Sequence, residues 1–301
     1  MKWRRTGGDG GDLEDLRGST SRGTGRMPGG LAGGAGGLGI VGVIIALLIT
    51  FMGGGGAAGF TPDASLDGFP QAPQANGPSF DESAPDPDAD LTAFMRFVTD
   101  DVQDAWTGIF AEAGEQFPRT TLVLFNGGVR TGCGAATSDT GPFYCPADQR
   151  VYLDLGFFRE LRDRFGAPGD FAQAYVIAHE VGHHVQNVLG ILPQVNQAQR
   201  DRPEEANELS VRLELQADCF AGVWGHTAYQ RQILEDGDLE EGLTAAAAIG
   251  DDRIASQAGQ RVNRESFTHG TSEQRTRWFL KGFQGGEVAS CDTFSVGFDE
   301  L

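Results

Sequence analysis

One short motif constrains this chain more than any other feature. Residues 179–183 read His-Glu-Val-Gly-His, and apolar residues recur at helical spacing on both sides of the motif, from 171 to 187. On a helix, side chains four residues apart lie one above the other, so the imidazoles of His179 and His183 can bind one zinc ion. Glu180 points about 100° away from His179, toward the open side of such a metal, where it can act as a general base. The motif therefore predicts a hydrolytic zinc site.

The alternative is a surface helix whose histidines are simply solvated. Three of the five histidines in the chain fall at 179, 183 and 184, and the residues around them are too apolar for a solvated face. These apolar residues are Tyr175, Val176, Ile177, Ala178, Val181 and Val185. Because polar side chains on a buried helix need partners, a bound metal explains the cluster better than solvent does.

A catalytic zinc site needs a third protein ligand. The extended metzincin motif is excluded, because Gln186 and Leu189 stand where it requires glycine and histidine. Further along the chain, Glu214 and Asp218 lie four residues apart in a segment with helical apolar periodicity. We expect Glu214 to be the third ligand and Asp218 to accept the ring N–H of a ligand histidine, although exposed acidic pairs are common on helices. The competing third ligands are Asp218 itself, His226 and His269.

These segments resemble a known family. HEVGHHVQ at 179–186 followed by ELQADCFAGVW at 214–224 is similar to the motifs of the bacterial "putative neutral zinc metallopeptidase" family, which resembles gluzincins in using HExxH and a downstream ExxxD. Further similar segments lie at 141–146, 151–155, 157–158 and 269–275, so the resemblance covers roughly 88–298 and the N-terminal anchor. The resemblance implies a membrane-anchored peptidase with one zinc per chain, bound by His179, His183 and Glu214, and with Glu180 as base. It implies no particular substrate.

An uncharged apolar segment lies near the N-terminus, at 31–52. As a helix, it would extend about 33 Å, enough to cross roughly 30 Å of hydrocarbon. The alternative is a cleaved signal peptide, but the region before the segment is long and no clear A-x-A site follows it. Basic residues precede the segment, so the positive-inside rule predicts a cytoplasmic N-terminus and an exported C-terminal domain on the bacterial inner membrane. These basic residues are Lys2, Arg4, Arg5, Arg17, Arg22 and Arg26.

Glycine and proline are concentrated on both sides of the apolar segment. The chain has 301 residues and 45 glycines, many of them in 1–37 and 53–59, and 60–87 is rich in proline and acidic residues. Such stretches lack hydrophobic periodicity and are typical of disordered or linking segments. We therefore expect four parts, namely a disordered cytoplasmic arm at 1–30, a transmembrane helix at 31–52, a linker at 53–87 and a zinc peptidase domain at 88–301.

The net charge and the cysteines restrict the partners and the compartment. The formal net charge of −19 argues against a nucleic-acid partner. All four cysteines lie in the domain that we expect to be exported, and an even count in an oxidising compartment suggests two disulfides. Cys133 and Cys145 flank a polar loop that they can staple, which leaves Cys219 to pair with Cys291. The alternative, a cysteine-ligated structural zinc, lacks any C-x-x-C pair.

The periodicities predict an α+β, helix-dominated, zincin-like domain with a small sheet. Strands are expected at 120–125 and 151–155, and the second resembles the strand that binds extended substrate in zinc peptidases, although a simple core strand fits equally well. The HExxH helix is expected to begin at Asp170, capped with Gln173, and to end at Gly190, and the Glu214 helix to begin near Pro203. Further helices are expected at 91–117, 157–165, 239–258 and 272–283.

These features together predict a membrane-anchored enzyme that hydrolyses peptide bonds in the cell envelope. Its partners would be a peptide or protein substrate and the bilayer, which 31–52 would cross. His269 or Arg275 could donate a hydrogen bond to the tetrahedral charge, although a capping or surface role fits each of them equally well. One alternative is a zinc-containing scaffold or binding protein without turnover, but a structural site has no need of Glu180. Another is hydrolysis of a different amide, such as a cell-wall crosslink.

Overall fold

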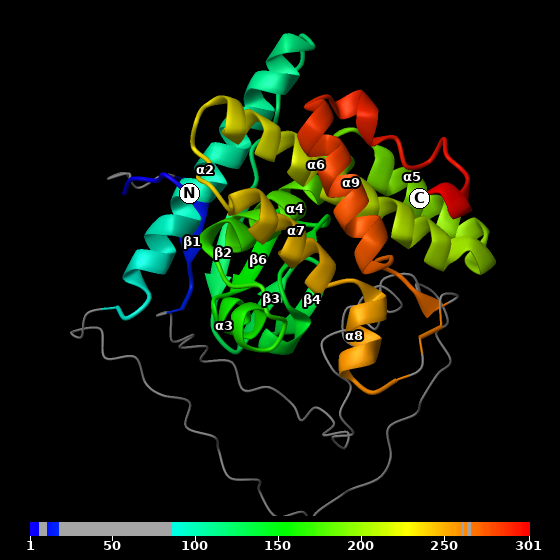
Figure 1. Ribbon diagram of the computed structural model, residues 1–301, viewed down its shortest axis with the longest axis horizontal. Helices are drawn as coiled ribbons and strands as arrows, with labels where there is room; N and C mark the ends of the chain where they lie inside the picture. The colour runs from blue at the N-terminus through cyan, green and yellow to red at the C-terminus, as the bar shows by residue number, and fades with distance from the viewer. Residues whose placement is uncertain (6–10, 18–85, 261, 264–265) are drawn as a thin grey trace, which may run out of the picture.

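The computed structural model describes residues 1–5, 11–17, 86–260, 262–263 and 266–301 (Figure 1). Within these residues, no helix has both the length and the apolar character needed to cross a bilayer. The transmembrane helix expected at 31–52, together with most of the expected arm and linker, lies outside the described residues.

A four-stranded sheet has the strand order β1-β2-β6-β5. Strands β1, β2 and β6 run parallel, and β5 pairs antiparallel with β6. The sequences of β2 and β6 are almost continuously apolar, which is typical of strands that are buried on both faces. A separate hairpin pairs β3 with β4. The strands are β1 (Leu13–Asp15), β2 (Thr121–Phe125), β3 (Gly128–Thr131), β4 (Gly134–Thr137), β5 (Phe143–Cys145) and β6 (Arg150–Asp154).

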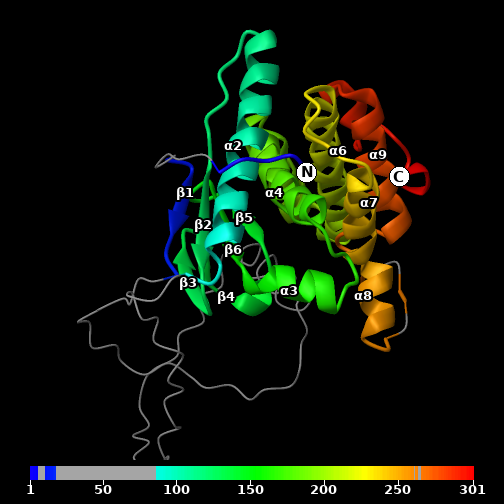
Figure 2. The same cartoon turned by 60° about the vertical axis from the view of Figure 1, so that its left-hand side comes forward.

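The helices form two layers beside the sheet (Figure 2). Helices α2 and α4 lie next to the strands, and α6, α7 and α9 pack on the other side of α4. This confirms the expected helix-dominated α+β fold with a small sheet. The helices are α2 (Ala89–Glu112), α3 (Gly156–Asp163), α4 (Asp170–Val188), α5 (Ile191–Asp201), α6 (Ala206–Gln230), α7 (Asp238–Ala248), α8 (Asp251–Gln257) and α9 (Ser272–Gly285).

Helix α4 carries the HExxH motif and lies at the centre of the molecule. Of its 19 residues, 14 are buried, because it has neighbours on nearly every side. Glycines allow α4, α6 and α9 to approach each other closely. A Cβ atom at Gly182 of α4 would lie 3.0 Å from the Ala217 carbonyl oxygen of α6, and one at Gly222 would lie 2.1 Å from the Phe279 carbonyl oxygen of α9. This close packing brings the polar side chains of the three helices together.

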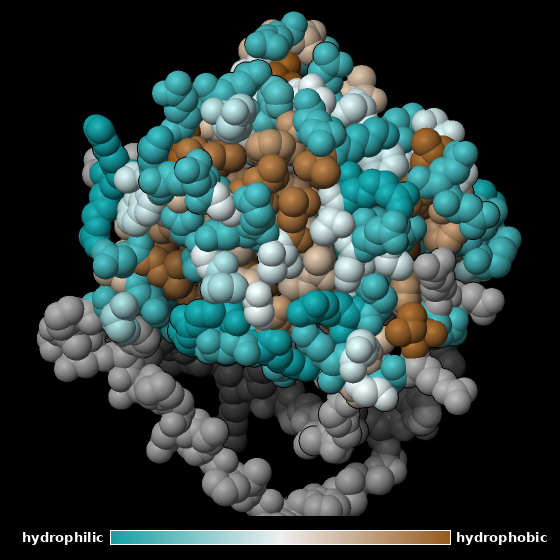
Figure 3. Space-filling model, viewed as in Figure 1, coloured by the Kyte–Doolittle hydropathy of each residue, from teal (hydrophilic) through white to brown (hydrophobic). Residues whose placement is uncertain are grey.

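Two disulfides tie peripheral segments to this core, with the pairing that the sequence predicted. Cys133, in the turn between β3 and β4, is bonded to Cys145 at the end of β5. Cys219 of α6 is bonded to Cys291, in a short 3-10 helix (Val288–Cys291) that follows α9. Figure 3 shows that the surrounding surface, on the face seen in Figure 1, is largely polar with scattered small apolar patches. This agrees with a solvated exterior on that face.

Part of the expected disordered arm belongs to the fold, which corrects the sequence analysis. Residues 11–17 include β1, which pairs in parallel with β2, and Leu13 is buried. Trp3 packs against Phe94 of α2, with ring centroids 5.3 Å apart. The segment is short and rich in glycine and charge, so its own sequence gave no periodicity. Its order comes from the edge of β2, which supplies unpaired backbone groups.

Candidate metal centre

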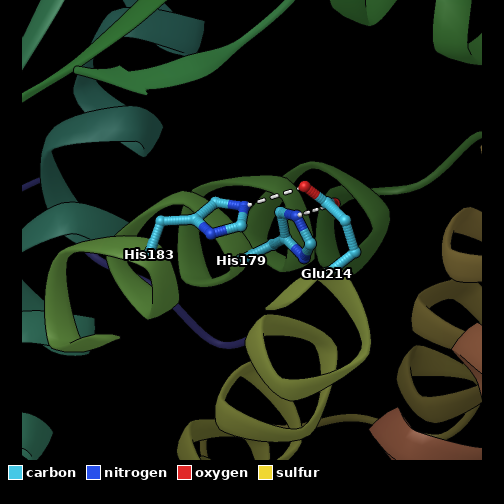
Figure 4. A group of neighbouring side chains, drawn as sticks. All are labelled: His179, His183 and Glu214. Atoms are coloured by element: carbon cyan, nitrogen blue, oxygen red, sulfur yellow. Dashed lines mark ion pairs between the residues drawn. The ribbon is translucent and has the colours of Figure 1, made fainter. Parts of the chain in front are cut away.

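Two histidines and one glutamate converge between α4 and α6 (Figure 4). The Nε2 atom of His179 lies 3.2 Å from Oε2 of Glu214, and Nε2 of His183 lies 3.5 Å from Oε1 of the same carboxylate. The three candidate ligand atoms all lie within 4.8 Å of one another. Two imidazole nitrogens and one carboxylate oxygen are a donor set that catalytic zinc sites use. The residues present therefore fit a zinc ion with an open position.

Asp218 orients His179 from the side opposite Glu214. The Nδ1–H group of His179 donates to Oδ1 of Asp218 over 2.9 Å, which leaves Nε2 facing the candidate metal position. Asp218 is fully buried, and it also accepts hydrogen bonds from the Tyr175 hydroxyl and from Nε and Nη2 of Arg275. Burial alone would raise the pKa of Asp218, but the Arg275 guanidinium holds it below its usual value. Asp218 therefore remains an anion.

The charges of His179 and Glu214 depend on each other. Burial alone would lower the pKa of His179, but the Asp218 carboxylate and the hydrogen bond with Glu214 raise it to about 10. Burial alone would raise the pKa of Glu214, but the two histidines hold it well below its usual range. In the protein without metal, a proton on His179 therefore balances the carboxylates, and a metal ion would have to displace that proton.

Gln186 orients the second histidine, and the sequence analysis did not assign it a role. The Nδ1–H group of His183 donates to Oε1 of Gln186 over 2.9 Å. The Gln186 amide nitrogen donates to the Leu213 carbonyl and to the side chain of Gln216, so its oxygen is left to accept. The side chain thus fixes the His183 tautomer whose Nε2 faces Glu214. The only signal in the sequence was its place three residues after His183 on the same helix.

Glu180 lies in a cavity of about 540 Å³ that the candidate metal ligands also line. Its side chain is 7% exposed, and burial raises its pKa although the neighbouring histidines oppose that effect. A carboxylate whose pKa is raised toward neutrality is suited to general-base chemistry.

His269 lines the same cavity but lies outside the group of three ligand atoms. Its Nδ1 lies 3.1 Å from Oδ1 of Asp251, and the other oxygen of Asp251 accepts backbone N–H groups from Thr268, His269 and Gly270. Burial alone would lower the pKa of His269, but Asp251 and the charge of Glu214 raise it. The His269 imidazole therefore has Asp251 as its partner at the wall of the cavity and lies outside the group of candidate ligand atoms.

The remaining polar candidates have other partners. His226, a competing third ligand, bonds the Phe283 carbonyl through Nδ1 over 2.7 Å. His184 donates to the Pro118 carbonyl and so stabilises the chain before β2. Arg275 is 1% exposed, and it donates to both carboxylate oxygens of Asp218 through Nε and Nη2. The structure thus brings His179, His183 and Glu214 together, whereas His226 and His184 contact backbone carbonyl groups of other segments.

A second acidic cluster lies at the start of α4 and comprises Asp170, Asp238 and Glu241. The Met1 amino group lies 2.7 Å from a carboxylate oxygen of Asp170 and 3.4 Å from one of Asp238. Glu241 accepts the backbone N–H of Phe171. These contacts account for the cluster without a metal.

Strand β5, and not β6, is the edge strand beside the cavity in the described part of the chain. The sequence analysis related 151–155 to a substrate-binding strand, but β6 is paired on both sides, with β2 and β5, and cannot accept another strand. Within the described residues, β5 has β6 as its one strand neighbour. Phe143 and Tyr144 of β5 line the cavity. The expectation for 151–155 is therefore replaced by its alternative, a core strand.

Comparison with known proteins shows the family of this chain. The chain is 52% identical over 225 residues to "Uncharacterized protein YpfJ" of Escherichia coli strain K12, covering 74% of this chain and 76% of that protein. It is 42% identical over 230 residues to "Uncharacterized protein Rv2575" of Mycobacterium tuberculosis strain H37Rv, covering 73% and 77% respectively. No solved structure matches. The family model described as "Putative neutral zinc metallopeptidase" matches residues 1–294, and the chain therefore belongs to that family.

Proposed function

We propose that this protein is a zinc-dependent peptidase with one zinc per chain, bound by His179, His183 and Glu214. The observation that carries the proposal is the convergence of these three side chains at a cavity that also contains Glu180. A structural zinc site would close with four protein ligands and would have no use for a buried carboxylate beside it. The arrangement therefore supports turnover over the scaffold alternative.

The side chains at the site have separate tasks in such a reaction. A zinc ion would supply a Lewis acid that lowers the pKa of water and polarises a carbonyl. Glu180 would take the proton of the attacking water and return it to the leaving amine. His269 would donate a hydrogen bond to the oxygen on which negative charge develops, held for this purpose by Asp251. The free edge of β5 would bind the substrate backbone in extended form.

We further propose that the enzyme works in the cell envelope, on the exported side of the inner membrane. The two disulfides support this compartment, because such bonds persist where the surroundings are oxidising. The uncharged segment at 31–52 supports attachment to the bilayer. The natural substrate would be a peptide or protein of that compartment, with other envelope amides, such as cell-wall crosslinks, as the alternative class.

Glu180→Gln tests the catalytic proposal. Glutamine keeps the size of the side chain but removes the base, so zinc content and melting temperature should match the wild type. Hydrolysis of a peptide library by the purified full-length protein should fall by about 10²–10⁴-fold, which is the usual contribution of a general base. Glu112→Gln, at an exposed position of α2, is the matched control and should keep full activity. Undiminished hydrolysis by a folded, zinc-loaded Glu180→Gln protein would show that Glu180 is not the base, and a zinc-loaded wild type that hydrolyses no peptide would favour the scaffold alternative.

A further inference from the structure

The N-terminal segment before the apolar stretch is bonded into the peptidase domain. The backbone N–H of Leu122 donates to the Asp12 carbonyl over 2.7 Å, and that of Leu16 donates to the Leu124 carbonyl over 2.8 Å. Leu13 is 8% exposed and belongs to the main hydrophobic core. Strand β1 therefore closes one edge of the sheet (Figure 1).

Ion pairs hold the charged residues of this segment against the rest of the domain. Nη2 of Arg119 lies 2.6 Å from Oδ2 of Asp12, and Nη1 of Arg150 lies 2.7 Å from Oε2 of Glu14. Each pair joins the N-terminal segment to β6 or to the chain just before β2. The charges on the two sides are complementary along the strand, which favours one register of pairing.

Arg17 fastens the end of this segment to the start of α2. The Arg17 side chain is 4% exposed. Its guanidinium donates to the Asp15 carboxylate, and its Nη2 donates to Oδ2 of Asp86 over 2.8 Å and to Oγ1 of Thr92 over 2.7 Å. Residue 17 and residue 86 are the last described residues before the apolar stretch and the first after it. Residues 17 and 86 therefore lie beside each other in the structure.

From this arrangement we infer that residues 1–17 and the peptidase domain lie on the same side of the membrane. Main-chain hydrogen bonds between β1 and β2 require both strands in one aqueous compartment, and a single helical crossing between 17 and 86 would separate them. Two of the six basic residues that suggested a cytoplasmic N-terminus form ion pairs with the domain, since Arg5 pairs with Asp90 and Arg17 with Asp86. The family match covers residues 1–294 and so includes this segment together with the peptidase domain.

This inference goes beyond the proposed function and is tested without measuring activity. All four native cysteines are in disulfides, so a single introduced thiol can be labelled selectively. Arg4→Cys reports on the N-terminal segment and Glu112→Cys on the domain, both at exposed positions of the full-length chain. In intact spheroplasts, a membrane-impermeant maleimide should label the two variants equally. Labelling of Glu112→Cys alone, with Arg4→Cys reached only after lysis, would overturn the inference.

A second measurement asks whether the segment supports the fold. Arg17→Glu places a carboxylate among Asp15, Asp86 and Asp88, so the purified full-length protein should melt about 4 °C or more below the wild type. Arg4→Glu makes the same charge change at an exposed position and should melt with the wild type. Adding Asp86→Arg to Arg17→Glu should recover part of the loss. Equal melting of the Arg17→Glu and Arg4→Glu proteins would contradict the inference.

Discussion

At the scale of single residues, each of the two candidate ligand histidines is oriented by a hydrogen bond at Nδ1, which leaves its Nε2 atom to face Glu214. Asp218 holds Nδ1 of His179, Gln186 holds Nδ1 of His183, and both imidazoles turn Nε2 toward Glu214. Asp218 is itself fixed by Arg275 and Tyr175. This arrangement lowers the cost of ordering the site when a metal binds, because the rings are already oriented.

The variant Asp218→Asn should bind zinc about 10–100-fold more weakly, which is the usual effect of losing a partner that orients a ligand. The amide keeps the shape but removes the charge that His179 and Arg275 face. Glu214→Ala, which removes a ligand, should lose zinc altogether. Competition with a chromophoric chelator measures both effects, and Asp236→Asn at an exposed position is the control. Unchanged affinity in Asp218→Asn would argue against its orienting role.

Zinc binding should become tighter as pH rises. Burial alone would lower the pKa of His179, but the Asp218 carboxylate raises it to about 10, so the ring is protonated near neutrality in the protein without metal. Each proton displaced changes the apparent affinity by up to about tenfold per pH unit below that pKa. Calorimetry in buffers of different ionisation enthalpy should detect release of at least about one proton. Affinity that is flat between about pH 6 and about pH 8 would contradict this prediction.

At the scale of elements, the positions of the main helices followed from periodicity, whereas their ends depended on neighbours. Helix α4 begins at Asp170 as expected, but the predicted cap with Gln173 does not form, and Glu241 of α7 accepts the Phe171 N–H group instead. The helix expected at 239–258 is divided into α7 and α8. The division lies at Gly250, where a Cβ atom would lie 2.4 Å from the Ser272 backbone nitrogen.

The variant Gly222→Ala should destabilise the protein by about 1–3 kcal/mol, which is the usual cost of overpacking a core. The added methyl would lie 2.1 Å from the Phe279 carbonyl oxygen, so α6 and α9 would have to separate. Gly108→Ala is the matched control, because Gly108 lies in α2 with nothing within 4 Å of the new atom. That change should leave stability unchanged or raise it slightly. Chemical denaturation measures both, and equal midpoints would contradict the proposed close contact.

At the scale of the whole molecule, one main hydrophobic core joins the helices that carry the candidate ligands. It extends through α2, α4, α6 and α9, and the two disulfides tie the periphery to it. The candidate ligands are also positioned by hydrogen bonds within the protein. The fold should therefore persist when zinc is removed, unlike that of a zinc finger.

Chelation should accordingly abolish hydrolysis while leaving the far-ultraviolet circular dichroism unchanged. Chelation should lower the melting temperature only because the protein loses the stabilisation that bound zinc gives. That stabilisation free energy grows with the logarithm of the free zinc concentration divided by the dissociation constant. Added zinc should restore activity. Loss of the helical signal on chelation would show instead that the metal is part of the folding free energy.

The sequence by itself determined the features that depend on local spacing. The residues of α4 and α6 follow helical periodicity, and their polar residues lie at four-residue spacing, so both helices and the residues of the candidate centre were predicted. The even cysteine count and the loop between Cys133 and Cys145 were enough to predict the disulfide pairing that the structure shows.

Only the tertiary structure decided what depends on contacts between distant segments. In the observed strand order, β6 lies inside the sheet and β5 at its edge. Strand β1 pairs with β2, which lies more than a hundred residues further along the chain. The role of Gln186 emerged only when Leu213 and Gln216 were seen to occupy its amide nitrogen. A short strand or a single polar side chain has little preference of its own, and its place is set by the partner that satisfies its hydrogen bonds.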